Sequence, residues 1–139
     1  MAEFTIRRRI RAPRERVWQE MLGLMAGADG EPEYEKQGVP APHGPGAIKE
    51  VNLFGYPMRE ETVALEPPCR RAYRMISDIP VDSYDGCTTL EAVGDATDLE
   101  WTARAEAADA ARAEDFAEKC RGVLERAVEI IAARSENGP

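Results

Sequence analysis

Histidine pairs, nucleophile motifs and nucleotide-binding glycine loops are all missing from this sequence. It has a single histidine, and neither H-E-x-x-H nor a carboxylate facial triad occurs, so a metal site lacks its usual donors. No G-x-S-x-G, G-x-G-x-x-G or phosphate-binding loop is present. We therefore expect no metal, no cofactor and no covalent-triad chemistry.

Paired cysteines and long apolar runs are also missing. Cys69, Cys87 and Cys120 are odd in number and widely spaced, which excludes a disulfide framework or a zinc knuckle. We expect all three to be small buried residues in a reducing cytosol. No run approaches 18 apolar residues, and no basic segment followed by an apolar stretch opens the chain. These absences predict a cytoplasmic protein without stable membrane insertion.

Positive charge is in the minority. The chain has 18 lysines and arginines against 26 acidic residues, a formal net charge of −8. Nucleic-acid binding needs a clustered positive surface, and the one basic run, residues 7–9, lies in alternating sequence that sends its members to opposite faces. We expect no nucleic-acid partner. The length of 139 residues and the hydrophobic fraction of 43% predict one globular domain spanning residues 1–139.

The periodic segments follow a definite order. Residues 4–11 alternate as in a strand with one buried face, and residues 13–25 have the apolar spacing of a short helix. Residues 26–46 are rich in glycine and proline, which interrupt any period. Five further strands are expected at residues 47–54, 58–65, 70–77, 81–92 and 97–106. The turns between them are short, which implies antiparallel neighbours.

The last segment predicts a long helix. Asp109 is a suitable N-cap, and apolar residues then recur every three or four positions to about Arg134. The members of this stripe are Phe116, Cys120, Val123, Leu124, Ala127, Ile130 and Ile131. A helix with one apolar face, following a sheet with one apolar face, should lie across that sheet.

Four stretches carry a resemblance to a known superfamily. They are residues 10–18 with Ala12-Pro13 and Val17-Trp18, the glycine-led residues 46–51, Glu60 with residues 64–71, and the hairpin residues Tyr84, Thr97, Leu99 and Trp101. Together they resemble the START-like or SRPBCC superfamily, and within it the small bacterial polyketide cyclase/dehydrase and lipid transport proteins. The resemblance implies an α+β helix-grip fold. In it a curved antiparallel sheet of six or seven strands wraps around the long C-terminal helix, with one or two short helices after the first strand.

The resemblance also implies a cavity between the sheet and the last helix, where two charged residues are candidates for ligand contacts. Arg8 shares a strand face with apolar residues, so it either anchors an anionic or carbonyl-bearing ligand or has a structural role. In the structural role, which we favour, it forms an ion pair or buries its stem while its head group reaches solvent at the sheet edge. Glu60 could be a cavity acid or base, the partner of Arg8, or a solvated carboxylate, because Arg59-Glu60-Glu61 leaves its face ambiguous.

The remaining candidates are apolar or aromatic. Tyr73, Tyr84 and Trp101 should face the helix, as core residues or as a pocket wall, and Gly86 should leave space beside Tyr84. Phe116, Cys120 and Leu124 should line the same cavity from the helix. His43, between two loop-forming residues, is expected to be a solvated loop side chain rather than a general base.

These residues favour a binding module for a small hydrophobic molecule such as a polyketide or a lipid. The first alternative is an enzyme of the polyketide cyclase or dehydratase type, with Glu60 or Tyr84 moving protons. The second is a protein-interaction domain like the chaperone-activator relatives, with a filled cavity. The oligomeric state stays open, with a homodimer through residues 26–46 as one alternative. A fold does not determine a function, so the residues of the site have to distinguish between these three functions.

Overall fold

The described residues form one antiparallel β-sheet and two α-helices. The computed structural model describes residues 1–24 and 34–137. Its elements are β1 (Ala2–Ile10), α1 (Arg14–Gly23), β2 (Ile48–Leu53), β3 (Tyr56–Glu66), β4 (Arg70–Met75), β5 (Ser83–Val93), β6 (Ala96–Glu106) and α2 (Ala110–Asn137). The order matches the prediction from the sequence, with strand ends displaced by up to two residues. Met25, predicted to end the first helix, lies outside the described residues.

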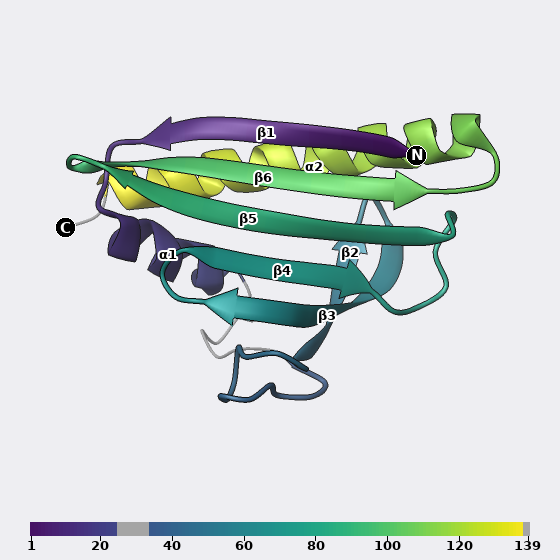
Figure 1. Cartoon of the computed structure of the whole chain (residues 1–139), viewed down its shortest axis with the longest axis horizontal. Helices are drawn as coiled ribbons and strands as arrows, with labels where there is room; N and C mark the ends of the chain where they lie inside the picture. The colour runs from purple at the N-terminus through teal and green to yellow at the C-terminus, as the bar shows by residue number, and fades with distance from the viewer. Residues whose placement is uncertain (25–33, 138–139) are drawn as a thin grey trace.

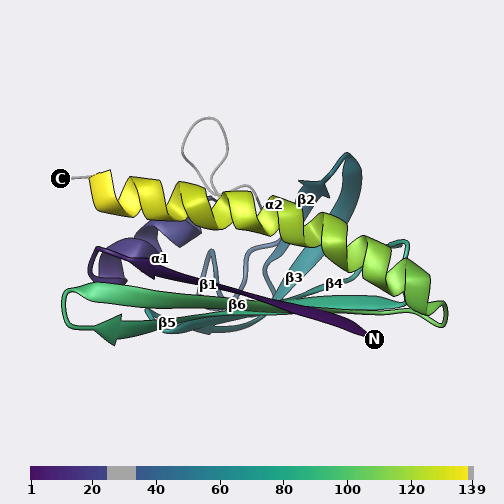
Figure 2. The same cartoon turned by 90° about the horizontal axis from the view of Figure 1, so that it is seen from above.

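The six strands form one antiparallel sheet in the order β1-β6-β5-β4-β3-β2. β1 therefore pairs with β6. After β1 and α1 the chain crosses to the opposite edge of the sheet, where β2 lies, and β3 to β6 then follow one another back to β1 (Figure 1). Figure 2 shows that α2 runs along one face of the sheet, while β2 and β3 bend up toward the helix. The curved sheet and the long helix confirm the predicted helix-grip fold.

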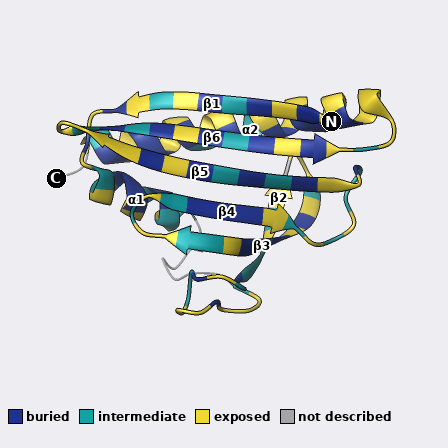
Figure 3. Ribbon diagram, in the orientation of Figure 1, coloured by how far each residue is buried: buried dark blue, intermediate teal, exposed yellow. Residues whose placement is uncertain are grey.

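Alternation along the strands decides which side chains meet the helix. In β1, Phe4, Ile6 and Ile10 are buried, whereas Glu3 and Arg7 are exposed. β6 repeats this pattern over its whole length, and Figure 3 shows buried and exposed positions taking turns along the strands. The buried members form one apolar layer between the sheet and α2, which is the core of the protein.

The long helix begins where the sequence predicts. Oδ1 of Asp109 accepts hydrogen bonds from the backbone N–H groups of Ala111, at 2.9 Å, and Arg112, at 3.3 Å. This cap satisfies donors that have no partner inside the helix. The helix has 28 residues, about 42 Å at 1.5 Å per residue, which is enough to cross the whole sheet. In the described part of the chain, no helix is apolar enough over a sufficient length to cross a membrane.

Two smaller features depart from the sequence-based expectations. Cys120 is buried as expected, but Cys69 is exposed and Cys87 is half-buried, so the prediction of three buried thiols was wrong for these two. Both lie where strand alternation or a turn places them outside the core. Within residues 26–46, where the sequence shows no period, Lys36 forms an isolated antiparallel bridge with Ile48.

Candidate functional site

An aromatic cluster occupies the interior between the sheet and α2. Tyr73, Tyr84 and Trp101 come from β4, β5 and β6, and Phe116 comes from α2; each is at most 8% exposed. The ring of Tyr84 meets Phe116 edge-on, with ring centroids 5.3 Å apart. The ring of Tyr73 lies 6.2 Å from Trp101, and its hydroxyl accepts a hydrogen bond of 3.0 Å from Nε1 of the indole. These residues face the helix, as predicted, and they pack closely against one another.

Gly86 does not leave an empty space beside Tyr84, which corrects the prediction from the sequence. Gly86 pairs with Tyr73 across β4 and β5, and a Cβ atom at Gly86 would overlap the Tyr73 side chain. The ring of Tyr73 therefore fills the volume that the glycine leaves. The small residue serves to let an aromatic ring lie against the backbone.

The hydroxyl of Tyr84 is the unusual polar atom of this cluster. It is buried beside the Tyr73 hydroxyl and the Cys120 thiol, but among the described residues it makes no well-formed hydrogen bond. Burial raises the pKa of Tyr84 far above its usual value, and burial raises the pKa of Cys120 to about 12. Both groups stay protonated at neutral pH, so Tyr84 is available as a hydrogen-bond donor.

A buried ion pair lies at the edge of the aromatic cluster. Nη2 of Arg71, on β4, donates to Oγ1 of Thr62 at 3.0 Å and lies 3.4 Å from Oε2 of Glu60, both on β3. Glu60 is 6% exposed, Arg71 4% and Thr62 1%. The guanidinium carbon of Arg71 lies 5.4 Å from the centre of the Tyr73 ring. The polar group and the aromatic wall thus share one site.

Glu60 lies on the inner face of β3, which the sequence left ambiguous. Its side chain points inward together with Met58 and Thr62, and the same alternation places Arg59 and Val63 outside. The partner of Glu60 is Arg71 and not Arg8, so that suggested pairing was wrong. Arg71 was not among the predicted site residues, although it lies two residues before Tyr73 and therefore shares the inward face.

A tyrosine and the histidine form a second polar pair close to the ion pair. The hydroxyl of Tyr34 lies 2.5 Å from Nδ1 of His43, and both side chains are half-buried. Burial lowers the pKa of His43, and the nearby Arg71 lowers it further. Burial raises the pKa of Tyr34, with Arg71 opposing that shift and Glu60 adding to it. His43 is therefore not a fully solvated loop residue, which corrects the expectation.

Backbone hydrogen bonds hold this loop against β3. The N–H of Gly46 donates to the carbonyl oxygen of Thr62, and the N–H of Thr62 donates to Ala47, both at 2.9 Å. Nε of Arg59 also donates to Oε2 of Glu35 at 2.8 Å, which secures the residue after Tyr34. The sequence does not predict these contacts, because the apolar residues of the loop follow neither helical nor strand spacing.

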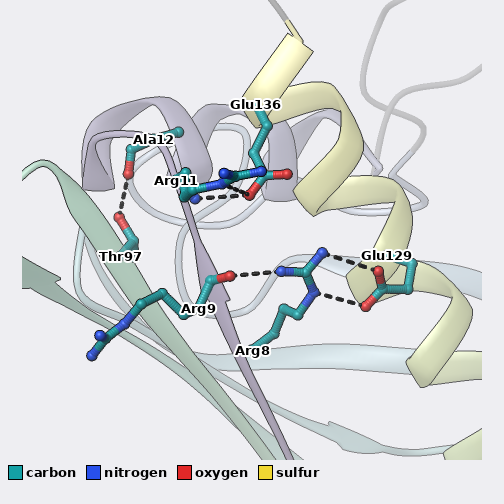
Figure 4. A network of polar contacts seen from close by, with 7 residues as sticks. All are labelled: Arg8, Arg9, Arg11, Ala12, Thr97, Glu129 and Glu136. Carbon is teal, nitrogen blue, oxygen red and sulfur yellow. Dashed lines mark hydrogen bonds and ion pairs between the residues drawn. The ribbon is translucent and has the colours of Figure 1, made fainter.

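Arg8 is on the inner face of β1, as predicted, but its guanidinium is bound to the helix. Nε and Nη2 donate to the two carboxylate oxygens of Glu129 at 3.0 and 3.2 Å, and Nη1 donates to the carbonyl of Arg9 (Figure 4). Of the two structural roles predicted for Arg8, the structure shows the ion pair. Figure 4 also shows Thr97 donating to the carbonyl of Ala12, which fixes the start of β6 to the link before α1.

The last predicted contact, Leu124, lies on the buried face of α2 and is 7% exposed. The inner aromatic cluster, the Glu60–Arg71 pair and the Tyr34–His43 pair together make up the candidate site. A groove of about 570 Å³ lies elsewhere, on the outer face of the sheet, and its lining includes Arg70, Arg74 and Arg104. Arg74 and Arg104 are bound to Glu61 and Asp85.

Comparisons with known proteins place the chain among helix-grip proteins. The Aha1 dimer from Colwellia psychrerythraea has 16% identity and a TM-score of 0.73, covering 99% of this chain and 98% of that one. A START superfamily protein from Mycobacterium smegmatis has 12% identity and a TM-score of 0.64, covering 96% and 97%. The di-domain ARO/CYC BexL from the BE-7585A biosynthetic pathway has 17% identity and a TM-score of 0.68, covering 99% and 51%.

These structural likenesses identify the START-like fold. A search of the curated proteins finds no match. The model of one protein family, described as polyketide cyclase / dehydrase and lipid transport, matches residues 1–136. This chain therefore belongs to the polyketide cyclase/dehydrase and lipid transport family.

Proposed function

We propose that this protein binds a small, mostly apolar molecule between the sheet and α2. The ligand is of the polyketide, lipid or similar metabolite class, with one oxygen-bearing polar group. The observation that carries the proposal is the Glu60–Arg71 pair buried directly beside the aromatic cluster. Membership of the family supports the same conclusion.

Burial of the charged Glu60 and Arg71 side chains costs free energy. Desolvating an arginine and a glutamate costs several kcal/mol per ion, and a buried pair often contributes less to stability than apolar residues of the same volume. A pair retained next to a wall of aromatic rings is thus a candidate for orienting a ligand. Arg71 would donate to a carbonyl or carboxylate oxygen, and the rings of Tyr73, Tyr84 and Phe116 would contact the apolar body. Arg8 is not among the proposed ligand contacts, because its guanidinium is already bound to the Glu129 carboxylate.

The test uses cis-parinaric acid, a fluorescent fatty acid with both an apolar chain and a carboxylate. Thr62→Val removes the hydroxyl that holds Arg71 while keeping the side-chain volume, and the matched control is Thr102→Val, whose hydroxyl bonds Thr5. We expect Thr62→Val to weaken the affinity for cis-parinaric acid about tenfold, as for loss of a hydrogen bond to a charged group. Thr102→Val should leave this affinity unchanged. Equal behaviour of the two variants would remove the ion pair from the binding site.

A cyclase or dehydratase activity is the second candidate, and the Tyr34–His43 pair favours it. With its pKa lowered, His43 is neutral at pH 7. When the Tyr34 phenol donates to Nδ1, the imidazole carries its proton on Nε2 and can donate a hydrogen bond from Nε2 to a substrate carbonyl oxygen. Such a hydrogen bond makes the carbonyl carbon a better electrophile for attack by an enolate carbon of the same substrate molecule. His43→Gln should then abolish turnover of a poly-β-ketone substrate while leaving its affinity unchanged, whereas a pure carrier shows no turnover in either form.

The closely packed interior favours a third candidate, an interaction domain whose interior takes no ligand. Its aromatic residues are at most 8% exposed. We further propose a cytoplasmic location, consistent with the free thiols of Cys69, Cys87 and Cys120. A homodimer is proposed by analogy with the Colwellia psychrerythraea protein, which is described as a dimer. Light scattering of the purified protein tests the dimer, and a monomer mass at all concentrations would exclude it.

A further inference from the structure

Phe54 sits in a backbone conformation that suits few side chains. It forms the two-residue turn between β2 and β3 together with Gly55, and the φ angles are +40° and +81°. Turns with positive φ at both central residues favour asparagine, aspartate and glycine. A phenylalanine there is energetically unfavourable, so its ring needs a reason to be at this tip.

The ring of Phe54 leans onto α2. It meets the ring of Phe116 edge-on, with ring centroids 5.8 Å apart, and Nζ of Lys119 lies 5.9 Å from its centre. Figure 2 shows the β2–β3 end of the sheet rising to the helix at this point. Phe54 is 39% exposed, whereas Phe116 beneath it is 2% exposed. The Phe54 ring is therefore the outer layer over Phe116.

A continuous path of side chains runs inward from this point. Phe116 contacts Tyr84 at 5.3 Å between ring centroids, and the Tyr84 hydroxyl lies beside Cys120, one helical turn from Phe116. That hydroxyl is a buried donor that lacks a well-formed partner among the described residues. Buried polar groups are generally paired, so this donor marks a place where a ligand oxygen would complete the site.

We propose that Phe54 is a gate: its ring moves off Phe116 to admit a small apolar molecule that presents an oxygen acceptor to Tyr84. The inference rests on the proposed binding function for the identity of what enters, but the gate itself is a property of the β2–β3 turn. A purely structural Phe54 would instead fasten the turn to α2, and its removal would loosen the whole fold.

The first experiment measures access to Cys120, which needs no ligand. In a Cys69→Ser/Cys87→Ser background, the rate of modification by methyl methanethiosulfonate reports on Cys120 alone. Phe54→Asn removes the ring while keeping a residue that accepts positive φ. The matched control is Val63→Ala, an apolar side chain of similar exposure (44%) on the outer face of the sheet. Urea unfolding of each variant measures global stability.

We expect Phe54→Asn to accelerate modification of Cys120 about tenfold or more, as local opening without global unfolding does, and to leave the urea midpoint unchanged or higher. Val63→Ala should leave the rate unchanged. An unchanged rate in Phe54→Asn, or a faster rate matched by a fall in the urea midpoint, would overturn the gate.

The second experiment measures binding kinetics with N-phenyl-1-naphthylamine, a neutral fluorescent probe. Removing a gate raises the association and dissociation rate constants together, about tenfold, with a smaller change in Kd. A parent protein that binds no probe would count against the proposed binding function, while the Cys120 rates would still decide the gate. A variant that changes only the dissociation rate constant would make Phe54 a wall of the site and contradict a gate.

Discussion

The ring of Tyr73 lies against the backbone of Gly86 on the neighbouring strand, where any Cβ atom would overlap it. This contact places the Tyr73 hydroxyl within reach of Trp101 and lets the ring lie beside the Arg71 guanidinium. One glycine thus positions the link between the apolar and the polar halves of the candidate site.

Gly86→Ala should consequently destabilise the protein by about 1–3 kcal/mol, the usual effect of overpacking a core. Gly122→Ala is the matched control, since the nearest side-chain atom to an added Cβ, on Arg126, is 3.9 Å away. Because Gly122 lies in the middle of α2, Gly122→Ala should stabilise the protein by about 0.5–1 kcal/mol. Urea denaturation of both variants measures the difference, and equal effects would contradict the packing described for Tyr73.

The buried ion pair predicts strong coupling between its members. Glu60→Gln leaves the Arg71 charge without its carboxylate and should destabilise by about 3–5 kcal/mol, whereas Glu60→Met combined with Arg71→Met should recover most of that loss. Glu61→Gln, which breaks the exposed pair with Arg74, should change stability by less than about 1 kcal/mol. A Glu60→Gln variant as stable as Glu61→Gln would mean that water reaches the pair.

The histidine predicts a specific dependence of stability on pH. Because its pKa in the folded protein is lowered, the unfolded chain binds the proton more tightly, so this contribution is present above the unfolded pKa of about 6.5 and is lost as pH falls through that value and below. The difference in unfolding free energy between the parent and His43→Gln should thus shrink from pH 7.5 to pH 5. His43 is the single histidine, so its NMR titration reads the pKa directly. A midpoint above 6.5 would contradict its burial beside Arg71.

The Arg8–Glu129 pair should behave as a surface interaction. The Arg8 and Glu129 side chains are 35% and 63% exposed, so a double-mutant cycle should give a coupling energy of about 1 kcal/mol or less, reduced at 1 M salt. Arg8→Met should leave the affinity for cis-parinaric acid unchanged. Weakened binding in this variant would return Arg8 to the site.

The sequence alone predicts the fold and half of the site. Alternation fixes Arg8 on the inner face, yet its partner Glu129 is 121 residues away and no local pattern identifies it. On β3, the charged run Arg59-Glu60-Glu61 does not show which face is inward, and the structure resolves this by burying Glu60 together with Met58 and Thr62. Tyr34 and His43 lie in a segment without any period, so tertiary hydrogen bonds, which the sequence does not display, bring them to Arg71.

The most direct test of ligand binding is native mass spectrometry of the purified protein, followed by identification of any released molecule. Leu124→Trp adds volume to the buried face of α2, and Ile130→Trp adds the same volume at a 44% exposed position of the same helix. We predict a bound apolar compound in the parent and in Ile130→Trp, and its loss in Leu124→Trp. A parent that carries no compound and binds neither cis-parinaric acid nor N-phenyl-1-naphthylamine would contradict the binding function and favour a protein-interaction domain.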